Sequence, residues 1–230
     1  MRLSVIIPVL DEQARIGPLL DALDGTTGID EVLVVDGGSH DGTVAQVSSR
    51  PRVHLLRAPR GRAAQLNAGA ALASGDVLLF LHADGRLPED VRRWIERALF
   101  HPAVVAGAFR TWTVFDQPGP RPWFAPLLHL ADLRSRYARL PYGDQALFVR
   151  ADAFRRAGGF PNLALMEDLE LARRLRRLGR IRTVPARVTV SGRRFVARPI
   201  LYTLLVNLFP TLYRLGVPPE LLAQMYGDPR

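Results

Sequence analysis

Residues 77–84 read VLLFLHAD, an unbroken apolar run that ends in a histidine and an aspartate. Strands that are buried on both faces of a parallel sheet have this composition, because neither face is left for polar side chains. Ligands of open α/β sheets bind outside the carboxyl ends of the strands. The run therefore predicts a buried strand over 77–81 that delivers His82 and Asp84 to a binding site.

Three further apolar runs lie upstream, at residues 3–9, 31–35 and 53–57. Segments with helical spacing follow these runs, over residues 11–23, 41–49 and 62–73. Asp11 and Asp41 stand at the start of two of the segments and are candidate N-caps. The alternation of strand and helix predicts a doubly wound α/β fold, in which a mostly parallel sheet is flanked by helices.

The chain beyond residue 100 is less regular. Its patterns predict strands at 106–114 and 145–149, a proline-rich loop at 116–126, and helices at 151–157 and 166–178. Nothing in this stretch reads as an interdomain linker. We therefore expect a single domain over residues 1–195.

An apolar helical tail is expected over residues 196–230. Its central part, residues 200–213, is shorter than the ~20 residues that span a bilayer. Seven apolar side chains are expected on one face of this helix: Ile200, Leu201, Leu204, Leu205, Leu208, Phe209 and Leu212. Two interpretations stay open. The helix packs on its own domain or on a partner subunit, or, with arginines at its ends, it lies in an anionic membrane surface.

The charged residues exclude several classes of chemistry. The net charge is +9 and all 31 basic residues are arginine, so a Walker lysine and a Schiff-base lysine are both excluded. Arginine suits a diphosphate, an anionic membrane or a nucleic acid, and an arginine-rich proteome would give the same charge. The arginines are scattered and form no recognised nucleic-acid motif, so we expect no nucleic-acid partner.

Cysteine usage and the N-terminus bear on the compartment. The chain has no cysteine, which excludes disulfides and thiolate chemistry and is compatible with a reducing compartment. Only Arg2 precedes the first apolar run, and no signal-peptide pattern follows it. We expect a cytoplasmic protein, which would lie at the inner membrane face if its tail binds lipid.

Acidic side chains follow three of the predicted strands. Asp11 and Glu12 come after the first strand, Asp36 after the second and Asp84 after the fourth. These acids, with arginine and without a Gly-rich phosphate loop, indicate an anionic ligand held partly through a divalent cation. Asp84 is the expected oxygen ligand, and His82 is either a second ligand or a hydrogen-bond partner of the first. Asp36 is suited to bind a base or ribose.

Six segments carry a resemblance to a known family: residues 5–12 (VIIPVLDE), 34–43 (VVDGGSHDGT), 66–69 (LNAG), 81–84 (LHAD), 158–160 (GGF) and 166–171 (MEDLEL). They stand in the order found in family 2 glycosyltransferases of GT-A fold, which the chain resembles over residues 3 to about 190. The resemblance implies a nucleotide-binding half over about 1–100 and an acceptor half over about 101–195. It also implies inverting transfer of a sugar from a nucleotide-diphosphate sugar to an acceptor hydroxyl.

The resemblance implies roles for single residues as well. Those expected to bind the nucleotide sugar are Pro8, Asp11, Glu12, Asp36, Arg62 (or Arg60), Asn67, Arg193 and Arg194. Asp84 matches the last acid of the family's Asp-X-Asp motif, which holds a divalent cation, Mn or Mg, against the diphosphate, and His82 would be its second ligand. Asp168 matches the catalytic base, with Glu167 and Glu170 as rivals.

Three positions depart from the family pattern: His82 replaces an acid, Gly37 an aspartate and Leu66 an arginine. The His-Ala-Asp variant, with residues 143–145 (GDQ) and 191–195 (SGRRF), is similar to a subgroup often labelled arsenosugar-biosynthesis-type glycosyltransferases. A catalytically silent nucleotide-sugar-binding protein is the alternative that His82 suggests, and a basic nucleic-acid-binding protein is less favoured. A lipid-linked acceptor would account for the apolar tail.

Overall fold

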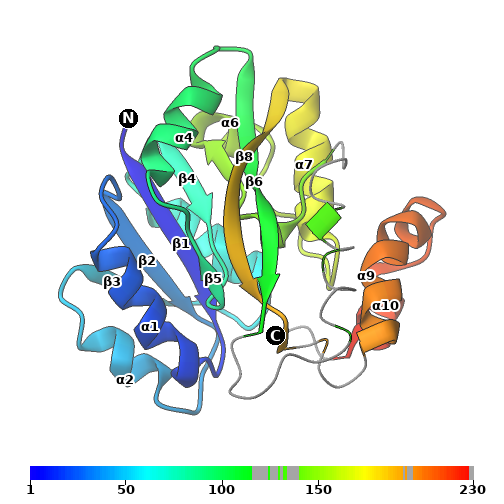
Figure 1. The fold of residues 1–230 in the computed structure, drawn as a ribbon, viewed down its shortest axis with the longest axis horizontal. Helices are drawn as coiled ribbons and strands as arrows, with labels where there is room; N and C mark the ends of the chain where they lie inside the picture. Colours follow the sequence, from blue (N-terminus) through cyan, green and yellow to red (C-terminus); the bar gives the residue numbers. More distant parts are fainter. Residues whose placement is uncertain are drawn as a thin grey trace.

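The computed structural model describes residues 1–115, 124, 129, 132–133, 140–193, 195 and 199–227. It confirms the α/β fold, with one curled sheet of eight strands in the order β3-β2-β1-β4-β7-β6-β8-β5 (Figure 1). The strands are β1 (Leu3–Val9), β2 (Glu31–Asp36), β3 (Val53–Arg57), β4 (Val77–Phe80), β5 (Gly85–Arg86), β6 (Val104–Val114), β7 (Phe148–Arg150) and β8 (Arg180–Ser191). Strands β3, β2, β1 and β4 run parallel, as do β6 and β8, whereas β7 runs antiparallel to both of its neighbours.

Helices cover both faces of this sheet. They are α1 (Gln13–Asp24), α2 (Thr43–Ser48), α3 (Arg62–Leu72), α4 (Val91–Leu99), α6 (Ala151–Arg156) and α7 (Glu167–Leu178). One buried cluster joins α1, α2 and α4 to side chains such as Ile7 and Leu79, and a second joins α3, α6 and α7 to Ile6 and Phe80. Neighbours in β1 thus alternate between the two cores, which is why the strand sequences are apolar throughout.

The loops after β1 and β2 hold each other through side chains that the sequence assigned to caps. Asp11 lies outside α1 with φ 51° and accepts a hydrogen bond from the His40 N–H, so its predicted capping role is wrong. Asp41 accepts hydrogen bonds from the N–H groups of Gln13 and Thr43 and therefore serves the first turns of α1 and α2 together. Side-chain hydrogen bonds thus join the two loops.

The strand predicted at 145–149 begins later. Residues Gly143–Gln145 form a short 3₁₀ helix, η1, and β7 starts at Phe148. The Gln145 side chain explains the difference, because it accepts a hydrogen bond from the Tyr142 N–H and donates one to the Phe109 carbonyl. These bonds fold the segment back on itself before it joins the sheet.

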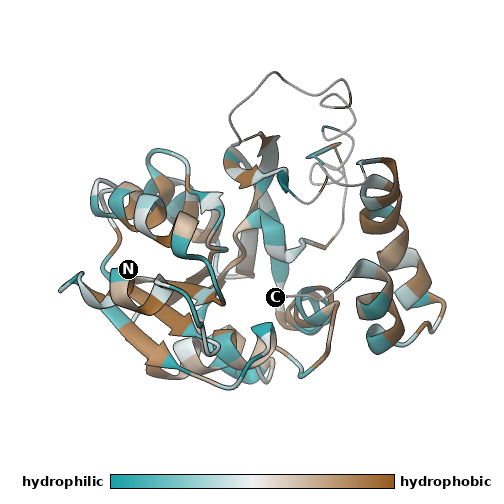
Figure 2. Ribbon diagram, turned by 90° about the horizontal axis from the view of Figure 1, so that it is seen from below, coloured by the Kyte–Doolittle hydropathy of each residue, from teal (hydrophilic) through white to brown (hydrophobic). Residues whose placement is uncertain are grey.

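The tail forms two helices, α9 (Pro199–Arg214) and α10 (Pro219–Tyr226), which pack on the start of α7. Leu205 and Phe209 are buried there, whereas Leu204 is 61% exposed and Leu208 is 48% exposed. The apolar side chains predicted on one face of this helix are therefore divided between a buried inner part and an exposed outer part, and brown residues run along α9 in Figure 2. No helix in the described part of the chain is long and apolar enough to cross a membrane.

The contact between β6 and its neighbours gives a test of this packing. A Cβ on Gly107 would lie 2.4 Å from Cζ of Phe148 and 2.6 Å from the Arg182 carbonyl oxygen. Gly107→Ala should therefore lower the free energy of unfolding by about 1–3 kcal/mol, measured by urea denaturation. Gly25→Ala is the matched control, because its Cβ would have no neighbour closer than 3.7 Å. Equal stability of the two variants would contradict the packing described here.

Candidate active site

A cavity of about 710 Å³ opens where β1, β4 and β8 end and where α3 and α7 begin. Both halves of the domain contribute to its wall, and so do the inner sides of α9 and α10. Among the sequence-predicted site residues, the wall contains Pro8, Glu12, Arg60, Arg62, His82, Asp84, Glu167, Asp168 and Arg193. Glu12 and Asp84, which follow β1 and β4, thus meet in the wall of one cavity.

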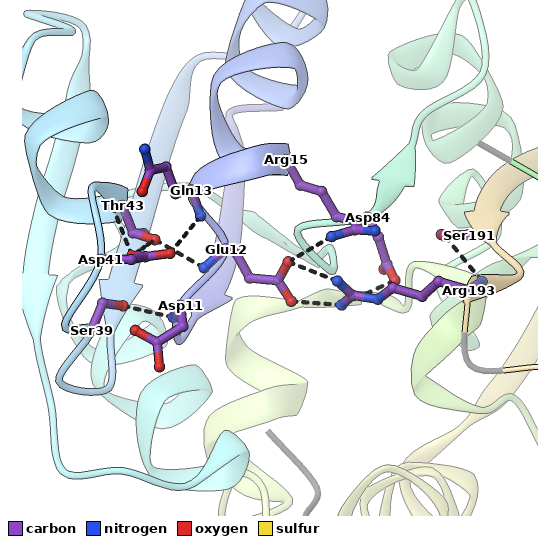
Figure 3. A network of polar contacts seen from close by, with 10 residues as sticks. All are labelled: Asp11, Glu12, Gln13, Arg15, Ser39, Asp41, Thr43, Asp84, Ser191 and Arg193. Carbon is purple, nitrogen blue, oxygen red and sulfur yellow. Dashed lines mark hydrogen bonds and ion pairs between the residues drawn. The ribbon is translucent and has the colours of Figure 1, made fainter. Parts of the chain in front are cut away.

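An ion-pair network crosses this cavity between β8 and the ends of β1 and β4. Arg193 places its Nη2 atom 2.6 Å from Oε1 of Glu12 and its Nη1 atom 3.1 Å from Oε2, a bidentate contact. The same guanidinium lies 3.6 Å from the Asp84 carboxylate, and Arg15 lies 3.7 Å from Glu12 (Figure 3). Glu12 is therefore the anchor of Arg193, which brings a positive charge beside Asp84.

Three predicted nucleotide-binding residues lie outside the described cavity wall. Asp36 is buried at the end of β2, where its carboxylate accepts hydrogen bonds from the N–H groups of Gly38 and Ser39. Asp11 accepts a hydrogen bond from the His40 N–H in the loop after β2. Asn67 donates to the Phe160 carbonyl and accepts from the Phe160 N–H, so its amide joins α3 to the loop before α7. Its observed contacts are structural. Arg194 lies outside the described residues.

The Arg62 guanidinium lies at the centre of the site, where its side chain is 26% exposed. Its Nε atom lies 3.2 Å from Oε1 of Glu167, and its Nη2 atom lies 2.6 Å from Nε2 of His82. Burial lowers the pKa of Arg62, but the charges of Glu167, Asp168 and Asp144 outweigh burial and leave the pKa above its ordinary value. Arg62 is held by protein groups, as Arg193 is by Glu12 and Asp84, and its contact with a phosphate stays a prediction. Arg60, exposed at the same wall, is better placed for one.

The contact with Arg62 defines the orientation of His82. A guanidinium has only donors, so Nε2 of His82 accepts in this contact. The Nε2 lone pair therefore faces Arg62, and the role of His82 as a second metal ligand stays a prediction.

The acids at the start of α7 differ in their surroundings. Oδ2 of Asp168 accepts a hydrogen bond from the Gly143 N–H, and Oδ1 accepts one from the Leu169 N–H at 2.7 Å. Glu167 is buried, and this burial, with a smaller contribution from Asp168, raises its pKa to about 6 against the opposing effect of Arg62. Glu170 pairs with Arg173 and Arg174 and is not among the described residues of the cavity wall, which favours Asp168 and Glu167 over it as the base.

The sequence missed several residues of the cavity wall. Asp144 follows Gly143 in η1, and Asp132 is a buried acid that accepts hydrogen bonds from the N–H and hydroxyl groups of Thr113. Tyr226 reaches the wall from α10. The GDQ motif marked Asp144 without giving it a role, whereas nothing in the sequence pattern singled out Asp132 or Tyr226.

The fit of a divalent cation depends on Asp84. No group of three or more acidic or histidine side chains that could hold a metal ion exists in the described part of the chain. Magnesium-type cations are often bound by one or two carboxylates together with phosphate oxygens of a substrate. The Asp84 side chain, 20% exposed at the cavity wall, meets that requirement. The Asp84 carboxylate therefore fits a divalent cation that binds together with the diphosphate of a substrate.

Comparisons with known proteins agree with this geometry. The family model described as "Glycosyl transferase family 2" matches residues 4–157. An undecaprenyl-phosphate 4-deoxy-4-formamido-L-arabinose transferase of Aeromonas hydrophila is 34% identical over 108 residues, which are 42% of this chain and 33% of that protein. A dolichyl-phosphate β-glucosyltransferase of Trichomonas vaginalis is 28% identical over 111 residues, with the same coverage. The matches thus span a third of these relatives.

Solved structures share the fold. A mannosyltransferase of Pyrobaculum calidifontis, in complex with GDP-Man and Mn²⁺, aligns with a TM-score of 0.66 and 24% identity over 98% of this chain and 68% of that one. S. aureus TarS residues 1–349, in complex with UDP-GlcNAc, aligns with a TM-score of 0.65 and 18% identity over 98% of this chain and 70% of that one. The GT-A fold expected from the sequence is confirmed.

The raised pKa of Glu167 predicts a pH dependence of stability. Between its ordinary value of 4.5 and about 6, Glu167 keeps its proton in the folded chain but loses it in the unfolded chain. The contribution of Glu167 to the free energy of unfolding is thus fully present below pH 4.5 and is lost as the pH rises through 6. Between pH 4.5 and 7 the free energy of unfolding of the wild type should fall by about 2 kcal/mol relative to that of Glu167→Gln, measured by urea denaturation.

The control is Glu170→Gln, which removes an acid from the same helix. A pH-independent difference between wild type and Glu167→Gln would contradict the assignment.

Proposed function

This chain belongs to glycosyl transferase family 2, and we propose that it transfers a sugar from a nucleotide-diphosphate sugar to an acceptor hydroxyl, with inversion at the anomeric carbon. One observation carries the proposal. The Arg193–Asp84 pair and the Asp168 carboxylate line the same cavity. A cationic anchor for a leaving diphosphate and a base for an attacking hydroxyl are the two groups that this reaction needs.

The donor is proposed to bind along the ends of β1, β2 and β4. Pro8 and Glu12 line the cavity there, and Asp36 would receive the base at the end of β2. Arg193 and Arg60 would contact the diphosphate, since guanidinium groups suit phosphate oxygens. A divalent cation, Mn or Mg, held by Asp84 would neutralise charge on the leaving diphosphate. The complexes of the two solved relatives, with UDP-GlcNAc and with GDP-Man and Mn²⁺, support such a donor.

Asp168 is the proposed base. Its carboxylate is oriented by two backbone N–H groups, whereas Glu167 is already paired with Arg62. In a single displacement the acceptor oxygen forms its bond to the anomeric carbon while the bond from that carbon to the phosphate oxygen breaks. Asp168 takes the hydroxyl proton, and the electron pair of the broken bond leaves with the nucleoside diphosphate. The opposed directions of attack and departure give inversion.

The carboxylates of the cavity favour a hydroxyl as the nucleophile. Asp132, Asp144, Glu167 and Asp168 all line it, and Asp168 is the one proposed to accept a proton. The names of the two relatives specify undecaprenyl-phosphate and dolichyl-phosphate. A phosphate nucleophile would need no base, whereas a hydroxyl must lose its proton as it attacks. A lipid-linked acceptor of this chain would therefore present a hydroxyl of its carried group.

The outer side of the tail is proposed to lie on an anionic membrane surface. Seven exposed apolar side chains gather on these helices and the turn between them: Ile200, Leu201, Leu204, Leu208, Leu215, Leu221 and Met225. We call them the outer apolar patch. Arg214 and the net charge of +9 complement anionic headgroups. The same two helices line the cavity, so docking of the patch would bring the cavity close to a lipid-linked acceptor.

The donor proposal is tested by calorimetric binding of UDP-, GDP- and TDP-sugars with and without Mn²⁺, and by slow donor hydrolysis. One donor should bind, and Asp84→Ala should weaken its binding about tenfold or more. Asp168→Asn should keep donor binding and lower turnover about 100-fold or more. Asp152→Ala, which removes an exposed acid from α6, should change neither. Absence of binding by every nucleotide sugar would defeat the proposal, and binding without turnover would favour the silent binding protein.

The membrane proposal is tested by flotation with vesicles that contain phosphatidylglycerol. Replacing Leu204 and Leu208 together by Glu should lower the partition coefficient at least about tenfold, because two side chains would leave the apolar phase. Leu72→Glu is the matched control, since Leu72 is 63% exposed but lies outside the outer apolar patch. Unchanged flotation of the double variant, or a wild type that dimerises through the patch and does not float, would remove the membrane from the proposal.

A further inference from the structure

We infer that His82 is a positioning residue, which acts through Arg62 to hold the Glu167–Asp168 pair in place for catalysis. The inference rests on the proposed function, because it assigns a role within the same reaction. It concerns the position at which this chain departs from the family's first metal-binding acid. The contact that carries it is the 2.6 Å approach of Nη2 of Arg62 to Nε2 of His82.

The surroundings of Arg62 leave its guanidinium little freedom. Its Nη2 atom would lie 1.8 Å from a Cβ on Gly143, so the guanidinium packs directly against this glycine. The Gly143 N–H is also the donor to Asp168. Movement of Arg62 would therefore disturb Glu167, through their ion pair, and Asp168, through the shared contact with Gly143.

A neutral acceptor at position 82 suits this arrangement for an electrostatic reason. The positive charge of Arg62 is already shared among Glu167, Asp168 and Asp144. A carboxylate at position 82 would add a fourth negative charge and would draw the guanidinium away from α7. The His82 imidazole accepts the hydrogen bond without that charge, so it directs Nη2 while Nε stays with Glu167. The replacement of the acid by histidine is thus linked to Arg62.

The contact also connects the two halves of the domain. His82 follows β4 in the donor half, Arg62 begins α3, and Glu167 begins α7 in the acceptor half. The chain from His82 to Glu167 needs only two contacts, of 2.6 and 3.2 Å. Loss of the first contact should affect the geometry of the base more than the affinity for the donor.

The experiment compares His82→Leu with His82→Gln in the full chain. Glutamine keeps an acceptor for Arg62, and leucine does not. With a donor that the wild type hydrolyses, His82→Leu should lower kcat about 10- to 100-fold, while His82→Gln stays within about threefold. Neither variant should change the Kd of Mn²⁺ with a nucleoside diphosphate by more than about twofold. Adding His82→Leu to Arg62→Lys should cost no further kcat, because the two residues act as a unit.

Two results would overturn the inference. Weaker Mn²⁺ binding in both His82 variants would make His82 a metal ligand, and an undiminished kcat of a folded His82→Leu would deny it any role. The ¹⁵N spectrum of the His82 imidazole provides a readout that needs no turnover. It should show a proton on Nδ1 and a bare Nε2, and the opposite tautomer would refute the contact. If no donor is hydrolysed, the proposed function fails, and this spectrum still decides the His82–Arg62 contact.

Discussion

The site depends on one partly buried positive charge among carboxylates. The Arg62 side chain is 26% exposed, and an ion withdrawn this far from water without partners would destabilise the folded chain. Glu167, Asp168 and Asp144 supply the opposite charge, and Arg62 in turn lets three acids lie close together at the start of α7 and in η1. Neither Arg62 nor the three acids would be stable in this place without the other. The pairing therefore determines where α3, α7 and η1 meet.

The second constraint is the glycine against which Arg62 packs. Gly143 leaves room for the guanidinium, and its N–H also orients Asp168. Any side chain at this position would move either Arg62 or the Asp168 carboxylate. The GDQ motif is thus explained residue by residue. Glycine provides space, the aspartate provides charge, and Gln145 ties η1 to β6 through the Phe109 carbonyl.

Sequence patterns predicted the sheet well, because buried strands consist of apolar residues that can be recognised directly in the sequence. The runs at 3–9 and 53–57 match β1 and β3, and the acids at the ends of β1 and β4 do line one cavity. Pairwise contacts leave no such trace. Nothing in the periodicity distinguishes Arg62, which is partly buried among acids, from Arg60, which is exposed, and nothing shows that the His82 lone pair is already used. Partner choice is decided by tertiary geometry, which a one-dimensional pattern does not contain.

The tail shows the same limit and leads to a structural consequence. Apolar periodicity in α9 located the helix but not its two apolar sides, since the inner side is recognised only once α7 and α10 are in place. Phe209 and Tyr226 from these helices complete the cavity wall, and Tyr226 lies within electrostatic reach of Arg62. The tail is thus part of the site as well as a surface. Whatever binds the outer apolar patch acts on helices that line the same cavity as the acids around Arg62, so the surface and the chemistry share one structural unit.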